Sequence, residues 1–319
     1  MRRTLLLVAK AATSALLLYL SLRWVNVAAL AERLGRLKPE WIALATLIVT
    51  TQVALLAVRW RAIAAACGAN LPLISALQFS FIGMFFNQVL PSTVGGDGAR
   101  IWLFARQGAG WARATYSVLI DRIVCVFVLA LIVVVCLPWT LELIPDPFAR
   151  GILLLMGFGV IAATFAFALM ETWFRNRFNR WRLTRHLSAA SRAAVDLCSS
   201  GRSIGIVILC SVTIHLFTVI AAWCCVKAIV APVSFTQVLF LVPPVLLVAT
   251  IPISIAGWGV RESAMIVAFA YAGLAQSNGL TLSILFGIVS FVVGVIGGVV
   301  WITSGLRMRS LSQALANAE

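Results

Sequence analysis

Two short polar stretches interrupt an otherwise apolar chain, and both carry an arginine beside proline, glycine and an acidic residue. The first is LPSTVGGDGAR at residues 90–100, and the second is IPISIAGWGVRE at residues 251–262. They align without a gap as P-x-[ST]-[VI]-[GA]-G-x-G-x-R. An arginine next to unpaired backbone N–H groups is a natural partner for a phosphate group. The repeated motif therefore predicts a pair of anion-binding sites.

The motif also predicts a break in the helix at each copy. Pro91 and Pro252 cannot donate a backbone hydrogen bond, and the neighbouring glycines allow backbone geometry that other residues resist. A helix should restart after each break, with Asp97 as the N-cap of the first. Irregular backbone at membrane depth needs polar partners from the protein or from a water-filled cavity. We therefore expect a cavity at each broken hairpin.

Arg100 and Arg261 are expected on the first turn of the restarted helices, where both would hold the phosphate. In the alternative interpretation both arginines are structural locks. Arg100 would then pair with Asp97, and Arg261 would pair with Glu262 or with the region of Asp121. The other candidate substrate-binding residues surround the two motifs: Asn87, Ser92, Gly96, Gly98, Ser254, Gly257 and Gly259.

Further polar residues within apolar segments are candidates for gating or for coupling to protons. Asp121 and Arg122 open an apolar stretch near one membrane face, as a gate lock with Arg100 or as an interfacial pair. Asn87 is expected to bond the broken backbone or a head group, and His215 is expected to be a hydrogen-bonded core histidine. The candidates for gating or proton coupling are Asp97, Asp121, Arg122 and Glu262.

The composition places these residues in a membrane protein. Hydrophobic residues make up 62% of the 319 residues and charged residues only 11%, with a mean hydropathy of +1.04. A soluble domain needs far more polar cover, so the fold class is all-α, a polytopic transmembrane helix bundle. The net charge of +15 is typical of the positive-inside rule and not of nucleic-acid binding.

The apolar stretches predict spans separated by charged loops. The loop 172–202 is rich in arginine and is expected to be cytoplasmic, and Arg59 and Arg61 mark the cytoplasmic end of one span. Both chain termini are then cytoplasmic, in a multi-pass protein of the cytoplasmic (inner) membrane. The predicted spans are 5–22, 41–61, 116–138, 151–170, 204–226 and 280–304.

The two motifs belong to an inverted-topology repeat in this interpretation. The flanking spans of 41–138 correspond to those of 204–304 at offsets near 163, and the motif itself repeats at 161. The hairpin 72–113 would begin and end in the cytoplasm, and the hairpin 235–274 would begin and end outside. Broken segments at matching positions of such repeats point to a binding site. Residues 1–319 form a single transmembrane domain.

Cysteine, tryptophan and nucleotide motifs add no second chemistry. The seven cysteines form no C-x-x-C pair, so no disulfide framework, metal site or cofactor is predicted. A nucleotide-binding G-x-x-x-x-G-K-[ST] loop is also missing from the sequence. Six tryptophans near the ends of predicted spans are expected to form the interfacial aromatic belt: Trp24, Trp41, Trp60, Trp139, Trp173 and Trp301.

The motifs together resemble the flippase-like family of integral membrane proteins that includes the transmembrane region of lysylphosphatidylglycerol synthase. The resemblance spans about residues 5–305 and rests on three stretches in order: Asn87 with the motif from Pro91 to Arg100, then Asp121-Arg122, then the motif from Pro252 to Glu262. Ala256 stands where relatives often have Gly. The synthases carry an aminoacyl-transferase domain after the membrane part, whereas this chain stops at Glu319. We therefore expect a stand-alone member that does not make lysyl-lipid.

What the resemblance implies is translocation of a phospholipid or glycolipid across the bilayer, with the motif residues near the pathway. The arginines and N–H groups agree with an anionic lipid substrate, either a phospholipid or a polyprenyl-phosphate-linked sugar. Two alternatives are a membrane-embedded transferase acting on a lipid-linked substrate and a non-catalytic subunit of a lipid-modifying enzyme. For the transferase, the sequence offers no metal-carboxylate cluster or nucleophile–base pair, so a transporter is favoured over an enzyme.

Overall fold

A computed structural model describes residues 37–89, 95–174, 182–251 and 259–304, without the side chains of 171–174 and 182–184. These described parts are helices joined by turns, with no β-strand. Five of their helices are long and apolar enough to cross a membrane. The predicted polytopic helix bundle is therefore confirmed.

The first half of the described chain has four α-helices in the order long, short, short, long. They are α3 (Pro39–Ala66), α4 (Leu73–Val89), α5 (Gly95–Phe104) and α6 (Trp111–Leu143). A π-helical turn, η1 (Ala105–Ala109), joins α5 to α6. Its bends use glycine where the backbone φ is positive, at 106° for Gly108 and 77° for Gly110.

The second half repeats this order of long and short helices. It consists of α9 (Gly201–Ala228), α10 (Phe235–Ala249), α11 (Val260–Tyr271) and α12 (Gln276–Thr303). Between the halves lie α7 (Pro147–Phe174) and α8 (Arg182–Ser199). A capping box starts α10, because Ser234 and Gln237 each bond the backbone N–H of the other.

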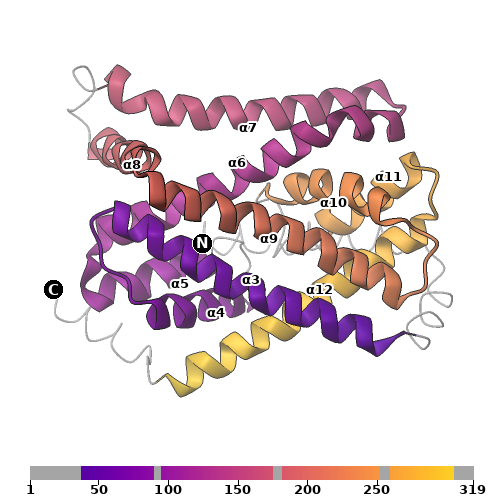
Figure 1. The fold of residues 1–319 in the computed structure, drawn as a ribbon, viewed down its shortest axis with the longest axis horizontal. Helices are drawn as coiled ribbons and strands as arrows, with labels where there is room; N and C mark the ends of the chain where they lie inside the picture. The colour runs from indigo at the N-terminus through magenta and orange to yellow at the C-terminus, as the bar shows by residue number, and fades with distance from the viewer. Residues whose placement is uncertain (1–36, 90–94, 175–181, 252–258, 305–319) are drawn as a thin grey trace, which may run out of the picture.

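Helices α3 and α9 pack side by side in opposite directions (Figure 1). The N–H of Lys38, before α3, donates to the carbonyl of Ala228 at the end of α9. Helix α4 packs on α12 just as α10 packs on α6, so the helix contacts correspond when the halves are exchanged. An inverted repeat requires such a correspondence, although the repeat itself stays a prediction.

The broken ends of both hairpins lie beside the middle of α12. A Cβ on Gly294, nine residues before the end of α12, would lie 3.0 Å from the side chain of Gln88 near the end of α4. At the other break, Arg261 near the start of α11 donates to Ser283, the eighth residue of α12. Both breaks are thus located within the bundle, away from the ends of this spanning helix.

The predicted spans 41–61, 116–138, 151–170, 204–226 and 280–304 are found as α3, α6, α7, α9 and α12, and 5–22 lies outside the described residues. Three helix ends lie five residues outside the predicted spans. Helix α3 continues to Ala66, and α6 starts at Trp111 and ends at Leu143. At Ala66 and Trp111 charged residues near the helix end misled the prediction, because arginines are accommodated within these helices.

Candidate functional site

Arg100 is the centre of a buried polar cluster where the first hairpin, formed by α4 and α5, meets α3 and α6. The residue is 3% exposed, and its Nη1 and Nη2 atoms both lie 3.1 Å from Oδ2 of Asp121. Its guanidinium stacks on the ring of Trp60 at 4.2 Å from the ring centroid. The indole of Trp60 is fixed in turn by a 3.1 Å hydrogen bond to Ser117. The position of the arginine is therefore set by two spanning helices.

Asp121 binds a second arginine from α3. Nε of Arg59 donates to Oδ1 of Asp121 at 2.8 Å, and its Nη1 donates to Ser211 of α9 at 3.2 Å. Asp121 is 1% exposed and Arg59 2%, and Asp121 lies about 15 Å along α6 from its start. Of the two alternatives given for Asp121, the structure shows the pairing with Arg100.

Asp97 links the cluster to an arginine that reaches solvent or lipid. Nη2 of Arg122 donates to Oδ1 of Asp97 at 2.9 Å, and its Nε donates to Oδ2. Arg100 is 3.5 Å from Asp97, a weaker contact than its contact with Asp121. Asp97 is the third residue of α5, so the predicted N-cap role is wrong because the carboxylate faces Arg122. Arg100, the sixth residue, lies in the second turn and not the first.

We call these five side chains the arginine cluster: Arg59, Asp97, Arg100, Asp121 and Arg122. Three cations face two anions, which leaves one excess positive charge among the described residues of the cluster. In addition, Nε of Arg100 has no hydrogen-bond partner in the described part of the chain. The Arg122 side chain is 44% exposed, so solvent screens part of this excess, whereas the buried Nε of Arg100 is a donor that an anion could satisfy.

The backbone before Arg100 approaches α4 closely. The N–H of Gly96 donates to Oδ1 of Asn87 at 2.9 Å, which confirms that Asn87 bonds the broken backbone. A Cβ on Gly96 would lie only 2.1 Å from the carbonyl of Gly83, and one on Gly83 would lie 3.1 Å from the Arg100 stem. Gly98 faces open space instead, and Ser92 lies outside the described residues.

Gly96→Ala is expected to destabilise the protein, whereas Gly98→Ala is not. The added methyl at position 96 must push two backbones apart, at a cost of about 3 kcal/mol. At position 98 alanine meets no neighbour, and it is the better helix former. Thermal unfolding followed by tryptophan fluorescence in detergent should give a lower Tm for Gly96→Ala only. Equal melting temperatures would contradict this packing.

The second motif forms a smaller, balanced cluster. Nη2 of Arg261 lies 2.9 Å from Oε1 of Glu262, and both side chains bond the hydroxyl of Ser283. Gly259, with a φ of 87° that favours glycine, donates its N–H to Oε2 of Glu262 at 2.6 Å. Arg261 is in the first turn of α11, as predicted, and its pairing is that of the structural-lock alternative. Ser254 and Gly257 lie outside the described residues.

Sequence reasoning missed two members of the first site. Trp60 was predicted to lie in the interfacial belt, but it is 0% exposed. Arg59 was interpreted as a marker of topology, yet it is a partner of Asp121. One signal could have found Trp60, because the apolar stripe Val53, Ala57, Trp60 continues to Ala64 with helical spacing. Arg59 is not part of this stripe.

His215 is a hydrogen-bonded core histidine, as the sequence predicted. The residue is buried in α9, and its Nε2 lies 2.9 Å from the carbonyl oxygen of Cys125 in α6. This contact ties α9 to α6 one turn beyond Asp121 and Arg122. His215 therefore helps hold together the helices that carry the arginine cluster.

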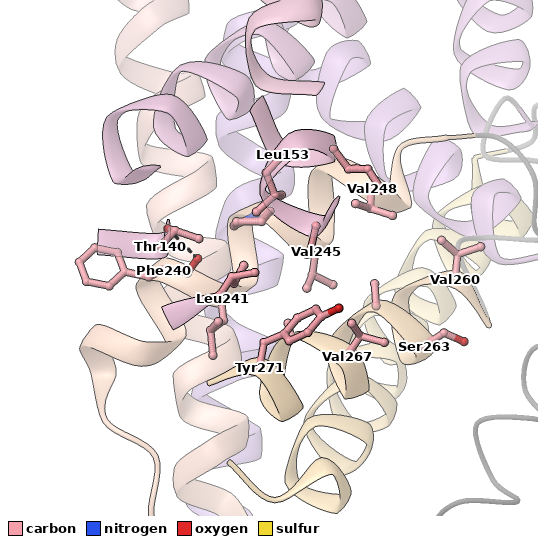
Figure 2. Close-up of a pocket in the computed structure, with 16 residues that line it drawn as sticks. Thr140, Leu153, Phe240, Leu241, Val245, Val248, Val260, Ser263, Val267 and Tyr271 are labelled. Carbon is pink, nitrogen blue, oxygen red and sulfur yellow. Dashed lines mark hydrogen bonds between the residues drawn. The ribbon is translucent and has the colours of Figure 1, made fainter. Parts of the chain in front are cut away.

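An apolar cavity of about 410 Å³ lies beside the second hairpin, between α6, α7, α10 and α11. Figure 2 shows Val245 of α10 facing Val267 and Tyr271 of α11 across it. Val260, the neighbour of Arg261, also lines the cavity. This space suits a hydrocarbon chain, since its lining offers few polar groups.

The fold and these sites define a multi-pass α-helical membrane protein with charged groups buried at broken helices. Residues 7–298 match the sequence profile of the lysylphosphatidylglycerol synthase TM region. The chain therefore belongs to this family, a membrane domain tied to lipid modification or transport. A comparison with curated proteins gave no match.

Proposed function

We propose that this protein transports an anionic, phosphate-bearing lipid across the membrane as a flippase. The observation that carries the proposal is the arginine cluster, with its excess positive charge and the unpaired Nε of Arg100. Carrying a phosphate through hydrocarbon without partners costs many kcal/mol. A buried cation at a helix break offsets that cost, so the cluster supports an anionic head group as the guest.

Asp121 gives the cluster a way to exchange partners. It is bound by Arg59 and by Arg100 from different helices. When Arg100 turns its guanidinium to a phosphate, Asp121 keeps Arg59, so no buried carboxylate is left without a cation. Asp97 and Arg122 form the neighbouring pair, and their opening would gate the approach of the head group. At the second hairpin, opening of the Arg261–Glu262 pair would gate the approach of the head group.

The lipid tails would remain in an apolar environment during this movement. The cavity beside α11 is lined almost wholly by apolar side chains, and it lies next to the helix that carries Arg261. A tail could occupy this space while the charged head follows the polar hairpins. An apolar cavity beside polar hairpins matches the chemistry of a lipid, which has one charged end and one apolar end.

The charge distribution supports an orientation with the end of α3 in the cytoplasm. Side chains described at that end comprise six arginines and one aspartate: Arg61, Arg106, Arg113, Arg185, Arg192, Arg202 and Asp196. The opposite end has three of each sign: Lys38, Arg150, Lys227, Glu40, Glu142 and Asp146. By the positive-inside rule the arginine-rich end faces the cytoplasm of the inner membrane.

The test is head-group accessibility in sealed proteoliposomes containing the full chain. Fluorescent phosphatidylglycerol, a short polyprenyl-phosphate sugar and zwitterionic phosphatidylcholine are each placed in both leaflets, and a membrane-impermeant quencher is added outside. We expect an anionic lipid to become accessible at least about tenfold faster than in protein-free vesicles, and phosphatidylcholine not to. If no lipid moves faster with the protein, transport of these lipids is refuted.

A further inference from the structure

A polar pocket of about 590 Å³ opens at the arginine-rich end of the bundle, away from the arginine cluster. It lies between the end of α3, the first turns of α6 and helix α8. Its lining includes small residues, among them Cys67 and Gly68, and this leaves room for a guest. Three carbonyls in the last turn of α3 accept the N–H groups of Cys67, Gly68 and Ala69 that follow it, which reduces the negative potential that this helix end presents to an anion.

The walls of this pocket are positively charged. Arg113 comes from α6, and Arg185 and Arg192 come from one face of α8, seven residues apart. Asp196, one turn after Arg192, is the only acidic residue among the described lining. Neither Arg113 nor Arg185 forms an ion pair with a described residue. Among the described lining residues, three cations and one anion leave an excess of two positive charges.

Helix α8 is held across the end of the bundle, and this orders the pocket in advance. Figure 1 shows α8 nearly end-on while α7 and α9 run across the view, so α8 crosses both steeply. The hydroxyl of Tyr116 in α6 bonds Nδ1 of His186, and Ser191 donates to the carbonyl of Phe167 in α7. Buried Ala190, Ser191 and Leu197 face the bundle. A helix with this orientation and an arginine-rich face is typical of a membrane interface.

We infer that this pocket binds the phosphate of an anionic lipid from the adjoining leaflet. Arginine presents paired N–H donors that match phosphate oxygens, and an interfacial helix holds them at the level of the head groups. The lipid is the preferred source over a soluble phosphate, because the pocket lies at the end of the spanning helices beside the bilayer surface. The site is separate from the arginine cluster and does not depend on transport.

Cys67 provides a native probe of the pocket. Burial raises the pKa of its thiol to about 11, and only the thiolate reacts with maleimides. Its labelling rate should therefore increase about tenfold per unit between pH 7 and pH 10, as the thiolate fraction increases. Mass spectrometry of the peptide that contains Cys67 measures this rate. A rate that levels off below pH 9 would contradict the predicted environment.

The binding test measures protection of Cys67 at pH 9 in micelles of a neutral detergent. The full chain is titrated with dioctanoyl phosphatidylglycerol, dioctanoyl phosphatidylcholine or glycerol phosphate. We expect saturable protection by phosphatidylglycerol alone. Arg113→Gln with Arg185→Gln should raise the half-protecting concentration at least about tenfold, as expected for lost charge-assisted hydrogen bonds. The matched control, Arg61→Gln with Arg202→Gln, removes two exposed arginines at the same end of the bundle that do not line the pocket.

Each other outcome would overturn the inference. Equal protection by phosphatidylcholine would show that the head-group charge is not recognised, and equal protection by glycerol phosphate would show a soluble anion as the guest. An equal loss in both double variants would assign the effect to general surface charge. Melting temperatures close to wild type show that the variants are folded. Because only binding is measured, failure of the proposed flippase activity would leave this result unchanged.

Discussion

Asp121→Asn is expected to lower the free energy of unfolding by about 3–5 kcal/mol, the cost of breaking a buried ion pair by removing one partner. Asparagine keeps the size of the side chain but leaves Arg59 and Arg100 facing a neutral amide. Both guanidiniums are buried, so water cannot replace the lost charge. Unfolding of the purified protein in mixed micelles, followed by tryptophan fluorescence, measures the loss.

A matched control and a double variant separate this ion network from a general effect of charge. Asp196→Asn removes an exposed carboxylate on α8 and should change the stability by less than about 0.5 kcal/mol. Arg59→Met should cost less in the Asp121→Asn background than in wild type, because the two residues interact directly. Additive effects of the two substitutions would contradict the network.

Arg100→Gln is expected to reduce translocation of phosphatidylglycerol at least tenfold, with the protein still folded. Glutamine removes the charge that would bind the phosphate, while Asp121 keeps Arg59 as its partner. Charged hydrogen bonds contribute about 1.5–3 kcal/mol, which corresponds to about ten- to 150-fold in rate. The rate constant of fluorescence loss in sealed proteoliposomes measures the effect.

Two variants test whether position and charge both matter. Arg61→Gln removes an exposed arginine two residues after Arg59 and should leave the rate within about twofold. Arg100→Lys keeps the charge but loses the planar fork, so an intermediate rate is expected. If Arg61→Gln were as slow as Arg100→Gln, the loss would reflect the surface charge of the protein and not its buried cluster.

The sequence was sufficient for those features that depend on neighbouring residues. Apolar stretches of spanning length predicted five of the helices, and proline and glycine predicted the two breaks. The hydrogen bond of Asn87 could be predicted as well, because its partner Gly96 is only nine residues away. Local propensity and hydropathy predict such features even when the packing of the helices against one another is unknown.

The partners in the arginine cluster could not be predicted, because they depend on long-range packing. Arg59 and Asp121 are 62 residues apart, and nothing in either segment alone indicates that α3 and α6 meet there. Asp97 is a good N-cap by local rules, but the ion pair with Arg122 outweighs that preference. The two motif copies also differ in ways that their alignment hides: Gly98 lies inside α5, whereas Gly259 precedes α11.

The central claim is that the excess charge of the arginine cluster selects an anionic head group. The most direct measurement compares the translocation rates of phosphatidylglycerol and phosphatidylcholine in the same proteoliposomes, for wild type and for Arg100→Gln. We predict that wild type moves phosphatidylglycerol at least about tenfold faster than phosphatidylcholine, and that the ratio falls towards one in the variant. An unchanged ratio with a functional variant would contradict the claim.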